Sequence, residues 1–259
     1  TPEQARVALK AGADRLYATT DALSETLWPE DLLAKVTPWL DEVCREIDHN
    51  RLDPYVAAGK PVAVGNISEL ALAVERGAIP EVRECIPVHN DYALQALADM
   101  GAEGVWLNSE LTLQEICHMA RNASIPVGYM VSGRIRTMTT EHCILMSTGK
   151  CIHDCDACKL RLEEHTLRGI DNDYMPVRTD RHGRSKIWSP KLFDGVPEMA
   201  EMLSCGVKRF MVDATLLSAE ETREATSRVA AAIAATASGA SLPARLKDAS
   251  VGHLFSPIG

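Results

Sequence analysis

Four cysteines lie within sixteen residues of one another, in the segment HCILMSTGKCIHDCDACK at 142–159. Their spacing is C-x7-C-x3-C-x2-C, and they are Cys143, Cys151, Cys155 and Cys158. Thiolates this close along a chain can bind a single inorganic centre. The residues between them are typical of a loop, which argues against four cysteines packed separately in a core. The segment therefore predicts a metal or cluster site.

The cysteine spacing leaves the identity of that centre open. Tetrahedral zinc is commonly held by four cysteines, and a C-x2-C pair within a longer set serves iron–sulfur clusters equally well. The other four cysteines of the chain are expected to be buried or incidental thiols. All eight suit a reducing compartment.

The bulk composition is that of an ordinary globular protein. The chain has 259 residues, of which 46% are hydrophobic and 24% charged. It has no apolar run long enough to cross a membrane and no signal-peptide pattern, so we expect a cytoplasmic protein. The net charge of −9 argues mildly against broad nonspecific binding to nucleic acid. Because the chain opens directly into a helical pattern, we also expect it to be part of a longer polypeptide.

A repeated unit predicts the fold class. Helical segments that end near a glycine lead into short apolar strands, and each strand is followed by polar residues. Short apolar strands that alternate with helices are typical of a parallel sheet buried on both faces. The expected helices are 2–11, 67–76, 91–100, 110–122, 196–204 and 229–240, and the expected strands are 15–18, 61–65, 85–89, 104–107, 126–131 and 209–213.

The polar residues after the strands favour a (β/α) TIM-like barrel, complete or incomplete, over an open doubly wound sheet. A barrel collects polar ends of several strands at one mouth, whereas a doubly wound sheet concentrates its site at one switch point. The residues expected at this mouth are Asn66, His89, Asn90, Asn108, Glu110, Arg134, Arg136 and Asp213.

These strand-end side chains suggest roles in binding and catalysis. Arg134 and Arg136 could clamp a carboxylated small molecule, and Glu110 or Asp213 could act as a general base. The amide and imidazole groups of the set, together with His142, could bind or orient a substrate. For each residue, a structural hydrogen bond or ion pair is the alternative interpretation.

Residues 143–190 interrupt the repeat. The four cysteines are followed by a charged stretch at 159–168, expected to be helical, and by a hairpin whose turn contains Gly183. We therefore expect a barrel domain formed by 1–142 and 191–259, with the cysteine-rich segment and hairpin inserted in it. The stretch 19–60 fits the repeat least well, with a helix expected between Trp28 and Glu46, and the tail at 251–255 is expected to dock as a strand.

Ordered stretches along the whole chain resemble the collagenase-like peptidase family U32. The similarity is a composite of five pieces: LNSELTLQEI at 107–116, GYMVSGRIRTMTTEHCILM at 128–146, MPVRTDRHGRSKIWSPKLFDG at 175–195, GVKRFMVDA at 206–214 and VGHLF at 251–255. In position, Glu110 matches the glutamate of a strand-end motif, and Asp213 stands where the family usually has Glu. Ala214 and Thr215 replace the usual Gly-Arg.

The resemblance implies a barrel-like catalytic domain and a [4Fe–4S] cluster held by Cys143, Cys151, Cys155 and Cys158. It also implies that Cys44 or Cys205 could replace one ligand, since some relatives take a ligand from far away. Members of the family are described as peptidases, and others act in oxygen-independent hydroxylation of RNA bases or quinone precursors. We therefore expect RNA or a small carboxylated or aromatic molecule as substrate.

Three functions remain open from the sequence. An iron–sulfur enzyme of the hydroxylation type is favoured by the resemblance and by the four cysteines. A peptidase is the second, although His142 and Cys143 are adjacent and would point to opposite faces of a strand, which makes them a poor catalytic pair. A zinc-stabilised binding or scaffold module without catalytic activity is the third.

Overall fold

The computed structural model describes residues 1–170 and 172–257, which divide into two compact units. The first unit comprises Thr1–Gly133, Asp194–Lys247 and the tail from Val251, and the second comprises Arg134–Phe193 and Asp248–Ser250. The second unit contains the whole of the cysteine-rich segment and hairpin that the sequence sets apart at 143–190, together with the strand that precedes them.

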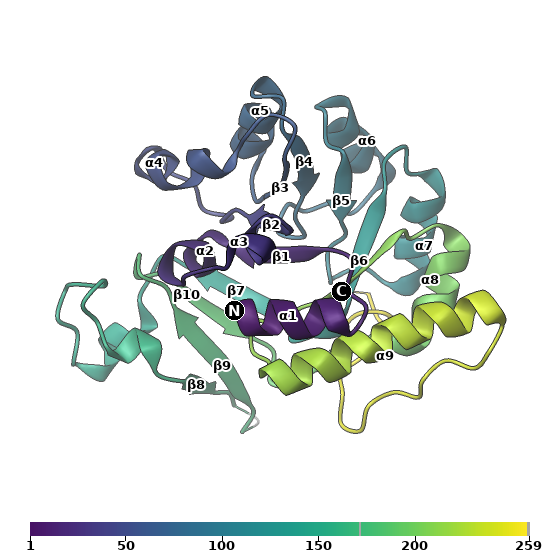
Figure 1. Ribbon diagram of the computed structural model, residues 1–259. Coiled ribbons are helices and arrows are strands. Elements are labelled where there is room, and N and C mark those ends of the chain that lie inside the picture. Colours follow the sequence, from purple (N-terminus) through teal and green to yellow (C-terminus); the bar gives the residue numbers. More distant parts are fainter. Residues whose placement is uncertain (171, 258–259) are drawn as a thin grey trace. The chain divides into compact units, whose positions relative to one another are not determined.

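The first unit alternates strands and helices along most of its length (Figure 1). Its strands are β1 (Leu16–Thr19), β2 (Val36–Trp39), β3 (Pro61–Val64), β4 (Ile79–Val82), β5 (Gly104–Trp106), β6 (Val127–Gly133) and β12 (Arg209–Val212). Its α-helices are α1 (Pro2–Lys10), α2 (Thr20–Glu25), α3 (Glu30–Leu33), α4 (His49–Leu52), α5 (Ile67–Glu75), α6 (Asp91–Asp99), α7 (Leu113–Asn122), α8 (Met199–Cys205) and α9 (Ala219–Ser238). The chain returns to this unit through β11 (Phe193–Asp194) and a short 3₁₀ turn, Val196–Glu198.

These seven strands form a parallel sheet that curls into an incomplete TIM-like barrel with helices around it. The order is β1-β2-β3-β4-β5-β6-β12, and every pairing in this series is parallel. The central strands are buried on both faces; in β3, for example, Val62, Ala63 and Val64 are fully covered. The barrel class expected from the sequence is thus confirmed.

Local sequence signals fix the helix ends. Thr1, Thr112 and Ser218 each cap a helix: the hydroxyl accepts the N–H of the Gln or Glu three residues later, and the side chain of that residue accepts the N–H of the capping residue. Gly206 and Gly239 end α8 and α9 in the left-handed conformation, as expected from their positions just past the helices.

One buried carboxylate joins strands from the middle and both ends of the sheet. Oε1 of Glu81, on β4, accepts from Nη1 of Arg15, just before β1, and from Nη1 of Arg209, on β12, at 2.6 Å each. The hydroxyl of Tyr17 donates to Oε2 at 2.6 Å. Glu81 is 2% exposed. The two guanidinium groups neutralise a charge that could not be buried alone.

A second buried carboxylate ties α9 and the chain after it to the sheet end. Asp194 is fully buried and accepts a bidentate pair from Arg228 at 2.7 and 2.9 Å. Its Oδ2 also accepts the backbone N–H of Leu246 at 2.8 Å. Such geometry satisfies all the lone pairs of a buried acid and makes Asp194 a structural anchor.

Four expectations about elements were wrong. The strand expected at 85–89 lies at β4 instead, and the helix expected between Trp28 and Glu46 is the short α3 followed by β2. Both missed strands contain a proline, which removes a ladder hydrogen bond and resembles a loop signal in sequence. Within 159–168, the chain forms a 3₁₀ turn and then a strand, and the tail at 251–255 forms turns, not a strand.

The second unit contains a four-stranded antiparallel sheet in the order β7-β10-β9-β8. Its strands are β7 (Arg136–Thr140), β8 (His165–Arg168), β9 (Tyr174–Thr179) and β10 (Ser185–Trp188). The expected hairpin is confirmed as β9 and β10. Two 3₁₀ turns, Ile144–Thr148 and Leu160–Leu162, flank the cysteine loop that lies between β7 and β8.

Among the described residues, no helix combines the length and the apolar character needed to cross a membrane.

Candidate metal centre

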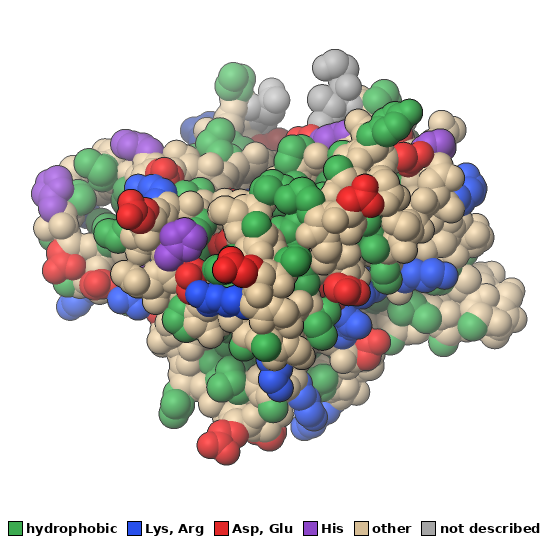
Figure 2. Space-filling model, turned by 90° about the horizontal axis from the view of Figure 1, so that it is seen from above, with side chains coloured by type: hydrophobic (Ala, Val, Ile, Leu, Met, Phe, Trp, Pro, Cys, Tyr) green, Lys and Arg blue, Asp and Glu red, His purple; other side chains and the backbone are tan. Residues whose placement is uncertain are grey.

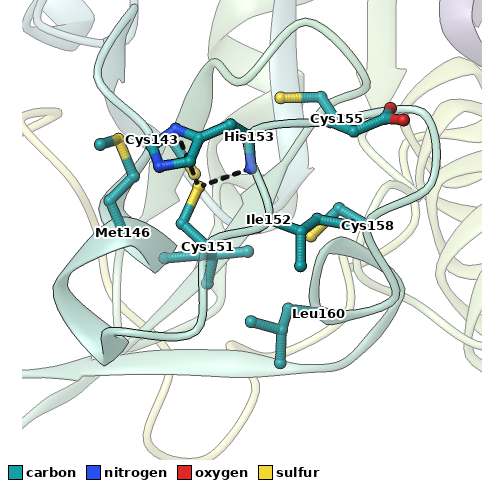
Figure 3. Close-up of a pocket in the computed structure, with 10 residues that line it drawn as sticks. Cys143, Met146, Cys151, Ile152, His153, Cys155, Cys158 and Leu160 are labelled. Carbon is teal, nitrogen blue, oxygen red and sulfur yellow. Dashed lines mark hydrogen bonds between the residues drawn. The ribbon is translucent and has the colours of Figure 1, made fainter.

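The four cysteines of the cysteine-rich segment line one pocket in the second unit (Figure 3). All four carry free thiols and are partly buried. The pocket is otherwise lined mainly by apolar side chains: its remaining residues are Leu145, Met146, Ile152, His153, Asp154 and Leu160. Four soft sulfur donors in one largely apolar pocket form a donor set that suits zinc or an iron–sulfur centre.

Local backbone structure directs two of the thiols. Cys143 precedes the 3₁₀ turn Ile144–Thr148, and Ser185 on β10 accepts the N–H of Ile144 at 3.0 Å, which fixes the chain beside Cys143. His153 adopts a left-handed φ of 57°, and its N–H donates to Sγ of Cys151 at 3.4 Å (Figure 3). A left-handed histidine is uncommon, and here it turns a backbone donor toward a sulfur atom.

The thiols are close enough to interact electrostatically. The pKa of Cys155 is raised above its ordinary value by burial and, after that, by Cys143, Cys158 and Cys151. Repulsion of this kind opposes the ionisation of Cys155. A bound cation would reverse it, because metal-bound thiols are deprotonated.

The thiols do not converge on the position of a single ion. Within residues 1–170 and 172–257, no group of three or more His, Cys, Asp or Glu side chains is arranged to hold one metal ion. Four thiolates around one zinc would place their sulfur atoms about 3.8 Å apart, because each Zn–S bond is about 2.3 Å. In this conformation the four sulfur atoms line a pocket and are not arranged around the position of one ion.

Most of the strand-end residues of the first unit take part in local hydrogen bonds. Asn66 and Asn90 cap α5 and α6, accepting the N–H of Glu69 and Ala93 at 2.9 Å. Asn108 donates to the carbonyl of Glu84 at 3.2 Å. Capping explains why asparagine stands at these positions. Their expected part in substrate binding stays a prediction.

One expected catalytic residue, Glu110, lies beside an expected substrate-binding residue, His89. Nε2 of His89 is 3.6 Å from Oε2 of Glu110, in the loops that follow β4 and β5, and both side chains are about half exposed. An imidazole next to a carboxylate is the arrangement of a general base and the group that orients it.

Asp213 lies at the ends of β12 and β6. Its Oδ1 accepts from the backbone N–H of Thr215 at 2.9 Å, and a Cβ at Gly133 would come within 2.8 Å of the Asp213 side chain. Asp213 therefore stands at the carboxyl end of a strand, as expected, in close contact with Gly133 at the end of β6.

The remaining expected residues belong to the second unit. Arg134 donates to the backbone carbonyls of Ser189 and Pro190. Arg136 begins β7, and the N–H of His142 donates to Oγ1 of Thr140 at 3.1 Å. The expectation that these residues meet Glu110 and Asp213 at one mouth stays a prediction.

The other cysteines differ from what the sequence suggests. Cys117 on α7 and Cys205 on α8 form a disulfide with a Cα–Cα distance of 5.2 Å, so they are not free thiols. Cys205 is therefore not a spare ligand for the metal centre in this structure. Burial raises the pKa of Cys44 to about 11, which keeps it a thiol near neutral pH.

Sequence reasoning missed a buried polar cluster at the ends of β2, β3 and β4. Arg83 is 1% exposed, lies over the ring of Trp39 and forms an ion pair with Glu42 at 3.2 Å. Glu69, in the first turn of α5, accepts the N–H of Gly65 at 2.9 Å. Burial raises the pKa of Glu69 to about 7. A charged residue directly after a buried strand, as Arg83 is, was the available sequence signal.

Comparison with known protein families identifies the chain. Residues 83–251 match the peptidase family U32. The chain belongs to peptidase family U32. Searches of curated proteins and of solved structures gave no match.

The U32 match includes the four cysteines, the His89–Glu110 pair and Asp213, and it begins at Arg83. It also spans the β9–β10 hairpin and both cysteines of the disulfide. The resemblance noted in separate stretches of sequence is therefore confirmed at the level of the family.

Proposed function

We propose that this U32 protein is a [4Fe–4S]-dependent enzyme of the oxygen-independent hydroxylation type. The observation that carries the proposal is the set of four free thiols around one apolar pocket. Cys143, Cys151, Cys155 and Cys158 would hold the cluster. When bound, such a cluster supplies one-electron chemistry, with a potential set by its surroundings.

One observation favours a polynuclear cluster over zinc. The sulfurs surround a pocket and do not converge on one ion position among the described residues. A cubane spreads its four thiolate ligands farther apart than a single tetrahedral ion does. Gly183 leaves space beside Sγ of Cys155 for either centre, since an added Cβ would lie 3.3 Å from that sulfur.

The chain's own residues would bind the substrate and move protons. We propose that His89 accepts a proton from the substrate while Glu110 orients its ring, since the two lie 3.6 Å apart at a strand-end edge. Asp213 is the second candidate base, and Arg134 and Arg136 are the candidate contacts to a carboxylate.

The charge distribution favours a small carboxylated or aromatic substrate over RNA. The net charge is −9, and on the face shown in Figure 2 acidic and basic side chains lie interspersed. Proteins that bind RNA through its backbone present a continuous basic surface.

Metal analysis of anaerobically purified protein tests the proposal. We expect a brown protein with broad visible absorbance, about four irons per chain and matching sulfide. Stoichiometric zinc in a colourless protein would favour the scaffold function instead. Hydrolysis of a protein substrate that survives removal of iron would favour the peptidase.

Substitution of one ligand tests which residues bind the cluster. We expect Cys151→Ala to abolish iron loading, because the loss of one thiolate exposes an iron atom of the cluster to solvent. Cys44→Ala is the matched control, since Cys44 belongs to the first unit and should leave loading unchanged. Full loading of Cys151→Ala would contradict this ligand set.

A further inference from the structure

The turn between β9 and β10, residues 180–184, is unusually well fixed; we call it the buttress turn. Oδ1 of Asp180 accepts the N–H groups of His182 and Arg184 at 2.8 and 3.0 Å. Oδ2 of Asp180 pairs with Nε of Arg184 at 3.1 Å, and both side chains are buried. Buried, fully paired charges of this kind make a rigid turn.

The backbone of the buttress turn lies against Cys155, one of the candidate metal ligands. Gly183 has a φ of +75°, and a Cβ built on it would lie 3.3 Å from Sγ of Cys155 and 4.0 Å from Cβ of Cys143. Only glycine provides both this backbone conformation and this close approach without strain. The glycine therefore leaves the peptide backbone directly beside the Cys155 sulfur.

Two arginine contacts hold the cysteine loop in place. Arg181, in the buttress turn, pairs with Asp156 at 3.0 Å, between Cys155 and Cys158. Nε of Arg161 donates to the backbone carbonyl of Cys155 at 3.0 Å. Arginine side chains thus fix the loop that carries Cys155, and the backbone of Gly183 lies against the sulfur of Cys155.

We propose that the buttress turn is a positioning element for the metal centre, in which Gly183 sets the place and solvent exposure of the Cys155 sulfur. This inference rests on the proposed function, because it assigns a role at the same four-cysteine site. Groups that surround the ligands of a metal tune both its affinity and its reduction potential.

A pair of glycine substitutions tests the inference. Gly149 lies in the same unit with a φ of +71°, and an added Cβ there meets nothing within 4 Å. Gly183→Ala and Gly149→Ala therefore impose similar backbone strain, but only the first crowds a sulfur. The measurements are the rate at which anaerobically loaded protein loses iron to a chelator and the midpoint potential of the centre.

We expect Gly183→Ala to raise the rate of iron loss by about tenfold or more and to shift the midpoint potential, as changes around metal ligands do. Gly149→Ala should match the wild-type protein in both. Equal behaviour of the two variants, whether both changed or both unchanged, would overturn the inference.

A second pair keeps the test decisive if Gly183→Ala does not fold. Arg181→Ala removes an ion pair between partly exposed groups, and Arg178→Ala removes an exposed arginine of the adjacent strand. Only Arg181→Ala should speed iron loss; unchanged rates in both would contradict the inference.

Wild-type protein without iron would refute the cluster itself, and the same comparison of release rates would then be made with zinc. Wild-type protein that binds neither metal would overturn both proposals.

Discussion

At the scale of single residues, Glu69 makes folding depend on pH. Burial raises its pKa from 4.5 to about 7 in the folded protein. A carboxyl group whose folded pKa is raised contributes stability that is complete below the unfolded value and is lost as pH rises through the folded value. We expect the free energy of unfolding to fall by up to about 3 kcal/mol between pH 4.5 and pH 8 through this group.

Chemical denaturation across this pH range measures the effect. Glu69→Gln should flatten the dependence, because the amide oxygen can still accept the N–H of Gly65 and nothing titrates. Glu75→Gln on the exposed side of the same helix is the control and should keep the wild-type slope. A slope that is identical in wild type and Glu69→Gln would exclude this explanation.

Site residues that belong to a local sequence pattern could be predicted. Site residues whose contacts come from distant parts of the chain were missed. The four cysteines share one segment, so their common pocket could be predicted from spacing. His89 and Glu110 were expected at one mouth because strand ends meet at one edge, but their contact was not predicted and the strand before His89 is β4, not 85–89. Glu69 and Arg83 were missed, because the residues that bury them come from segments distant in the sequence.

At the scale of elements, the disulfide between α7 and α8 should stabilise the first unit. Cys117 and Cys205 close a loop of 88 residues, and the chain-entropy model gives about 4–5 kcal/mol for a loop of that length. We expect reduction by a strong thiol reagent to lower the melting temperature of the wild type but not of Cys117→Ser. Equal melting temperatures with and without reductant would show that the bond does not form in solution.

The anchor at Asp194 gives a second prediction for α9. Asp194→Ala should destabilise the protein by about 3–5 kcal/mol, because it leaves the guanidinium of Arg228 without its buried partner. Glu220→Ala removes an exposed ion pair with Arg223 on the same helix and should leave the stability almost unchanged. Thermal and denaturant unfolding compare the two, and similar losses would contradict the anchoring role.

Helices could be predicted more reliably than strands. The capping pairs of α1, α7 and α9, and the glycines that follow α1 and α9, are local signals that the chain carries beside each helix. β2 and β4 each contain a proline, and β4 also contains the buried Glu81. These strands exist because their neighbours in the sheet complete them, which no local pattern records.

At the scale of the whole molecule, the curled sheet ends in strands that pair on one side only. Among the strands of residues 1–170 and 172–257, β1 pairs only with β2, and β11 and β12 each pair only with β6. All four residues of β12 are partly exposed, whereas β3 is almost fully buried. We expect amide hydrogen exchange in β12 to be faster than in β3, as measured by mass spectrometry of peptides. Equal protection would mean that a further segment or a second copy covers the edge.

The carboxylate of Glu81 links the two ends of this sheet through ion pairs. Arg15 and Arg209 lie at opposite ends of the strand order, and both reach the same oxygen atom on the middle strand. The radius of the curl is therefore constrained from within by charge attraction as well as by the twist of the strands. Glu81→Gln would weaken both ion pairs at once. The sheet should then flatten, and its two ends should move apart.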